Sequence, residues 1–103
     1  MLLTFNAGRT ILKINILGKK ITFASTALGI NRFIPIEKLI LMGNVQGILK
    51  ERPDFSGMSE RDIKFEGVRM FKEKIDTLKT QEEVKNYILY EMESQGYRLI
   101  SIQ

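Results

Sequence analysis

The side chains best suited to acid–base chemistry in this sequence are four glutamates near its C-terminal end: Glu82, Glu83, Glu91 and Glu93. A glycosidase-type or metal-binding pair needs carboxylates that converge in a cleft. The first two glutamates instead fit the first turn of a helix, where the helix dipole favours negative charge. The last two fit the solvent side of the same helix. The sequence therefore predicts no catalytic residue, no metal ligand and no cofactor site.

Composition excludes further reaction classes. The 103 residues include no cysteine and no histidine. Without cysteine there is no thiolate nucleophile, disulfide or sulfur-bound metal, and without histidine the usual proton shuttle is absent. We expect a non-catalytic protein, with a small enzyme that uses carboxylates or tyrosine as the least favoured alternative.

The chain carries no recognisable membrane segment. Its N-terminal apolar run is too short for a signal peptide, and no window approaches the roughly 18 apolar residues of a membrane span. A sequence without cysteine is also compatible with a reducing compartment. We therefore expect a soluble, cytoplasmic protein with no membrane partner.

Basic residues are concentrated at the N-terminal end. Residues 1–36 hold five cations and no acid, whereas residues 37–103 hold 11 basic and 12 acidic groups. Such an imbalance can mark an anionic partner, and it can also be a solvated sheet face that guards strand edges. The candidate contacts for an anion or a nucleic acid are Arg9, Lys13, Lys19, Lys20 and Arg32.

The N-terminal third has the pattern of β-structure. Residues 2–5 read as a short strand, and residues 10–17 (TILKINIL) alternate between apolar and polar side chains. Gly18 supplies a reversal, after which residues 20–25 continue the alternation. The pattern predicts an antiparallel β-hairpin or meander, with Phe5 and Phe23 in its core.

Residues 36–50 permit two interpretations. Pro35 can precede a short helix over residues 36–42, or two strands can flank a turn at Gly43 and Asn44. We prefer a helix or turn over residues 36–42, followed by an extended segment over residues 45–50.

The C-terminal half is helical up to its last few residues. Ser59 is a good N-cap for a helix over residues 60–77, and Thr80 with Glu83 forms a capping box for a second helix. Gly96 is the left-handed residue expected to end that helix. Residues 97–102 (YRLISI) then read as a strand whose apolar residues occupy both faces, which favours a position inside the sheet.

These elements predict one α+β domain over residues 1–103. Two C-terminal helices pack on one face of an N-terminal antiparallel sheet, and the terminal strand joins that sheet. Tyr87, Leu89 and Tyr90 place apolar surface on more than one side of the second helix, which makes them candidate interface residues. Phe55, a lone aromatic in the connector over residues 48–62, is a further interface candidate, although we prefer the interpretation that it tucks under its loop. We expect a small binding or adaptor domain that forms a homo-oligomer or binds another protein. A nucleic-acid-binding module that uses the basic hairpin is the alternative.

Overall fold

The computed structural model describes all 103 residues and contains two compact units. Residues Met1–Ile36 and Leu78–Gln103 form the first unit, and Glu37–Thr77 form the second. The prediction that residues 1–103 make one domain stays a prediction.

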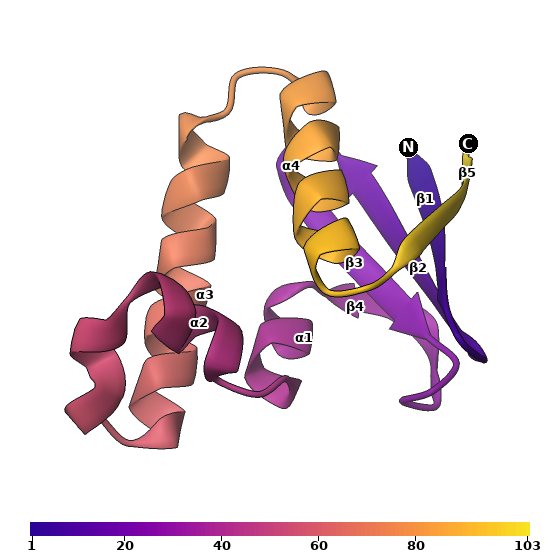
Figure 1. Ribbon diagram of the computed structural model, residues 1–103. Helices are drawn as coiled ribbons and strands as arrows, with labels where there is room; N and C mark the ends of the chain where they lie inside the picture. The colour runs from indigo at the N-terminus through magenta and orange to yellow at the C-terminus, as the bar shows by residue number, and fades with distance from the viewer. The chain divides into compact units, whose positions relative to one another are not determined.

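The first unit is built on a five-stranded antiparallel sheet with the order β4-β3-β2-β1-β5. Its strands are β1 (Leu2–Ala7), β2 (Thr10–Leu17), β3 (Lys20–Ser25), β4 (Ile30–Pro35) and β5 (Arg98–Ile102). Figure 1 shows the two ends of the chain side by side at β1 and β5, where Leu2 and Gln103 exchange backbone hydrogen bonds of 2.7 and 2.8 Å. The predicted α+β class, the N-terminal meander and the joining terminal strand are confirmed.

The core of this unit follows the alternation of the central strands. Leu12, Ile14 and Ile16 of β2 are buried, whereas Lys13 between them is exposed. Leu3 and Phe5 of β1 and the side chains of Ile21 and Phe23 of β3 are buried with them. One face of the sheet is therefore apolar, because successive side chains of a strand point to opposite faces.

Helix α4 (Gln81–Ser94) covers this apolar face through contacts with β2 and β5 (Figure 1). Val84, Ile88 and Met92 are its buried stripe, at helical spacing. The Thr80 hydroxyl accepts a hydrogen bond of 3.1 Å from the Glu83 backbone N–H, as the predicted cap requires.

The C-terminal end of α4 is fixed by Gly96. This glycine has φ +89°, and the backbone N–H groups of Gly96 and Tyr97 donate to the carbonyls of Glu93 and Met92. These two bonds form the Schellman arrangement, which satisfies carbonyls that the helix leaves without partners. The chain then turns directly into β5.

Two predictions about strands are wrong. Strand β5 lies at the edge of the sheet beside β1, not inside it, and β4 forms the opposite edge although no strand was predicted over residues 30–35. The register between β1 and β5 shifts between Thr4 and Phe5, so Ile100 has no partner in β1. Apolar residues on both sides of β5 thus reflect an irregular, exposed edge.

The second unit is helical. Its elements are α1 (Glu37–Met42), α2 (Gln46–Glu51), the short 3-10 helix η1 (Pro53–Gly57) and α3 (Glu60–Thr77). Helix α3 packs against α1 and α2. Its start is capped as predicted, because the Ser59 hydroxyl accepts a hydrogen bond of 3.1 Å from the Asp62 backbone N–H.

The predicted helix over residues 36–42 is confirmed, but the extended segment over residues 45–50 is wrong, because α2 occupies it. A close approach between helices holds α2 in place. A Cβ atom built on Gly67 would lie 2.5 Å from Cδ1 of Ile48 and 3.5 Å from Cγ2 of Ile40. A glycine inside α3 is unfavourable for an isolated helix. Here the absence of a side chain at Gly67 lets Ile48 of α2 pack closely against α3.

Two glycine substitutions test this description. Replacing Gly96 by alanine should lower the free energy of unfolding by about 1 kcal/mol, because a Cβ atom opposes the left-handed backbone. Replacing Gly47 by alanine should raise it by roughly 0.5–1 kcal/mol, because Gly47 is helical and nothing lies within 4 Å of its Cβ position. Urea unfolding followed by circular dichroism measures both; changes of equal sign would contradict the assigned backbone.

Candidate binding surfaces

The sheet face opposite α4 carries mainly polar side chains, and we call it the open face. Cross-strand pairs define it: Lys13 of β2 pairs with Thr4 of β1 and Ala24 of β3, and Thr4 pairs with Ser101 of β5. Asn15 and Thr22 form the next pair along the same face. Lys13 is exposed and the other side chains are half-buried, so this face meets solvent with polar groups.

Six exposed cationic side chains belong to the strands and turns of this sheet. Residues 1–36 and 96–103, which contain every strand, include no aspartate or glutamate. Lys13 and Lys20 are placed on the open face by their registers in β2 and β3, and Arg98 by its pairing with Asn6, the neighbour of buried Phe5. The others are Arg9 and Lys19 at the hairpin turns and Arg32 on β4.

The structure thus brings the five predicted anion contacts into one unit and adds Arg98, which the sequence analysis missed. Arg98 lies 66 residues beyond Arg32 in the chain, and only the pairing of β5 with β1 brings it to this face. All six side chains are exposed.

Ion pairing distinguishes these cations from those on the helices. Arg52, Lys64, Arg69 and Lys85 each lie within ion-pair distance of a carboxylate on their own helix or loop. No such pair involves the side chains of the sheet cations Arg9, Lys13, Lys20, Arg32 and Arg98. Their charges are therefore available to an external anion.

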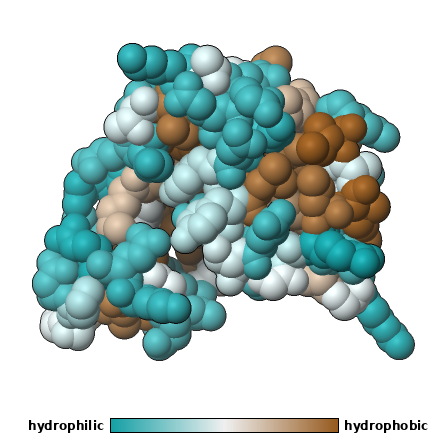
Figure 2. All heavy atoms as spheres, turned by 45° about the horizontal axis from the view of Figure 1, so that its top comes forward, coloured by the Kyte–Doolittle hydropathy of each residue, from teal (hydrophilic) through white to brown (hydrophobic).

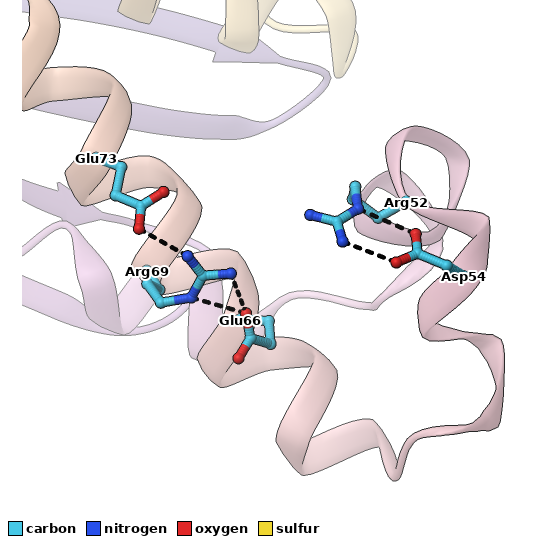
Figure 3. Close-up of polar contacts among 5 residues, drawn as sticks. All are labelled: Arg52, Asp54, Glu66, Arg69 and Glu73. Atoms are coloured by element: carbon cyan, nitrogen blue, oxygen red, sulfur yellow. Dashed lines mark hydrogen bonds and ion pairs between the residues drawn. The ribbon is translucent and has the colours of Figure 1, made fainter.

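Figure 3 shows two groups of ion-paired side chains, both in the second unit. Arg69 of α3 bonds to Glu66 and to Glu73, and these hydrogen bonds raise the pKa of Arg69 above its ordinary value. Both carboxylates follow the i,i+3 and i,i+4 spacing of a helix surface. This cluster is a solvated helix face whose charges already satisfy one another.

The connector over residues 48–62 is braced internally. Phe55 is only 8% exposed, and the Arg52 guanidinium carbon lies 4.2 Å from the centre of its ring. Arg52 also donates hydrogen bonds of 3.0 and 2.7 Å to the two carboxylate oxygens of Asp54, which lowers the pKa of Asp54 (Figure 3). Phe55 is therefore buried, as the preferred interpretation expects, and does not stand out from the surface.

The second exposed feature of the first unit is apolar. Ile100 and Ile102 of β5 are 52% and 46% exposed. Figure 2 shows hydrophobic residues gathered on the right of the view, where Figure 1 has β5 and the chain ends. Of the predicted interface residues on α4, Tyr90 is 68% exposed, and Tyr87 and Leu89 are half-buried.

All four glutamates considered for acid–base chemistry lie on α4. Glu83 belongs to the N-terminal cap of α4, and Glu82 pairs with Lys85. No group of three or more acidic side chains is arranged to hold a metal ion. None of the helices combines the length and the apolar character needed to cross a membrane.

No protein-family model, no curated protein and no solved structure matches the chain. The chemistry of the two exposed surfaces, the open face and the β5 edge, is therefore the basis for assigning a function.

The anchoring role of Phe55 can be measured directly. Replacing Phe55 by alanine should lower the free energy of unfolding by about 3 kcal/mol, because a buried aromatic ring and its contact with Arg52 are lost. Phe65 is the matched control, since it also lies beside an arginine, Arg61, but is 51% exposed. Its replacement by alanine should cost less than about 1 kcal/mol. Equal losses in denaturant unfolding would contradict the buried position of Phe55.

Proposed function

We propose that this chain is a non-catalytic binding module that self-associates through the edge of β5. The observation that carries the proposal is a strand with one neighbour only, bearing two large apolar side chains that are about half exposed. An unpaired strand edge offers backbone N–H and C=O groups to another chain. We keep the cytoplasm as the expected location.

The two edges of the sheet differ in how they are protected. Edge strands of monomeric proteins commonly carry charged side chains or proline, which discourage pairing with other chains. Strand β4 has Arg32 in its middle and Pro35 at its end. Strand β5 has Arg98 at its start, and its remaining four residues are uncharged and lack proline. This contrast favours β5 as the edge that pairs.

A second copy of the chain is the occupant that fits this edge best. A two-fold interface uses the same patch on both subunits. Pairing of β5 with its own copy in antiparallel orientation would bring the two Ile100 side chains near the axis and would add backbone hydrogen bonds. Tyr90 and Leu89 of α4, the helix that contacts β5, are candidates for the border of the interface.

A single substitution tests the proposal. The parent protein should show a concentration-dependent mass above that of the monomer in sedimentation velocity at micromolar concentrations. Replacing Ile100 by lysine should shift it to monomer, because two like charges would meet close to the axis. Folding should survive, since Ile100 is 52% exposed.

The control is Leu28→Lys, in the turn between β3 and β4. Leu28 is 46% exposed, close to the exposure of Ile102, but it lies away from β5. This variant should associate like the parent. A parent that stays monomeric throughout the concentration range would refute self-association. Loss of the dimer in Tyr90→Ala but not in Ile100→Lys would move the interface from the strand edge to α4.

A further inference from the structure

We infer that the open face binds single-stranded nucleic acid. The inference rests on the charge and register of the sheet and does not require that the chain self-associates. Two observations carry it: a track of three cations, Lys13, Lys20 and Arg98, whose side chains form no ion pair, and an exposed aromatic ring on the neighbouring edge strand.

The cations cross the open face as a diagonal. Arg98 pairs with Asn6, which also pairs with Ile11 of β2, so Arg98 lies on the level of Ile11. Lys13 is two residues further along β2, and Lys20 lies opposite Leu17. Six residues of β2 separate the two ends, which corresponds to about 20 Å along the strand. Arg9 and Lys19 extend the same two ends, because they occupy the adjoining turns.

The middle of the track has an aromatic neighbour. Ile34 of β4 pairs with Phe23 of the core, and Phe33 precedes Ile34 at the point where the register between β3 and β4 shifts. From the alternation of side chains along a strand we infer that Phe33 faces the open side. Phe33 is 45% exposed, and the small Ala24 is the β3 residue at which the register with β4 shifts. An exposed ring beside a small residue can stack on a base, and stacking tolerates any sequence. The sequence analysis did not identify this ring, because it assigned no strand to residues 30–35.

The shape of the surface favours a single strand over a duplex. A duplex groove admits a helix or a two-stranded ribbon, whereas the open face is one side of a five-stranded sheet. A single strand can lie along such a face with its phosphates on the cations and its bases turned toward the ring. Thr4, Asn15 and Thr22 supply polar groups between the cations.

The experiment measures anisotropy of a fluorescent single-stranded DNA of about ten nucleotides, longer than the roughly six that stacked spacing would place along the track. The parent should bind at low salt, and its affinity should fall as salt is raised. In the triple variant Lys13→Gln, Lys20→Gln, Arg98→Gln, the slope of log affinity against log salt should flatten by about two units, at roughly 0.7 for each lost phosphate contact. Phe33→Ala should weaken binding roughly tenfold with an unchanged salt slope, because stacking is not ionic.

The matched control is Lys38→Gln, Lys72→Gln, Lys79→Gln, which removes the same charge from three exposed lysines of the helices and a loop. This variant should keep the salt slope and most of the affinity of the parent. Circular dichroism melting of each variant checks that it is folded. Absence of binding at low salt would overturn the inference, and so would equal losses in the two triple variants, because net charge alone would then explain them.

Two further probes distinguish a single-stranded nucleic acid from other anionic partners, namely a duplex and an anionic membrane. A duplex of the same length should bind more weakly than the single strand; tighter binding of the duplex would overturn the inference. Vesicles rich in phosphatidylserine should not displace the oligonucleotide. Displacement that disappears in Leu17→Gln, the 69% exposed leucine beside the β2–β3 turn, would assign the cations to a membrane surface and overturn the inference.

Discussion

The pleat of the antiparallel sheet is the constraint on which the rest of the first unit depends. Neighbouring side chains of a strand must point to opposite faces, so burial of Leu12, Ile14 and Ile16 under α4 forces Lys13 to the other side. A shift of the register by one residue would bury Lys13 and expose three large apolar groups. The alternation that builds the core therefore also fixes which charges the protein displays.

The sequence correctly predicts those helix ends and strands whose position is set by interactions between residues close together in the chain. Ser59, Thr80 and Gly96 mark helix ends through hydrogen bonds and a left-handed backbone within a few residues of each position. The alternation of residues 10–17 likewise identifies β2, because its period of two is a property of the strand itself.

The failed predictions depend on contacts between distant residues. Gly43 and Gly47 weaken the helical signal around α2, and this segment is nevertheless helical where Ile48 lies against Gly67 of α3. Strand β5 has apolar residues on both faces and still lies at an edge of the sheet. The register shift in its pairing with β1 leaves Ile100 without a partner and exposed. Arg98 and Phe33 could not be grouped with the hairpin cations for the same reason, since the register of β5 and β4 brings them there.

The two candidate surfaces are geometrically compatible. Antiparallel pairing of two β5 edges about a two-fold axis perpendicular to the sheet would join the sheets side by side and leave both open faces on the same side. Like charges on one face repel one another, and an anionic partner relieves that repulsion. Two tracks on one continuous surface would also bind a longer strand more tightly than either track alone, since the second contact becomes intramolecular. The two proposed surfaces would thus support one another, because association of copies through β5 would enlarge the surface that a polyanion can follow.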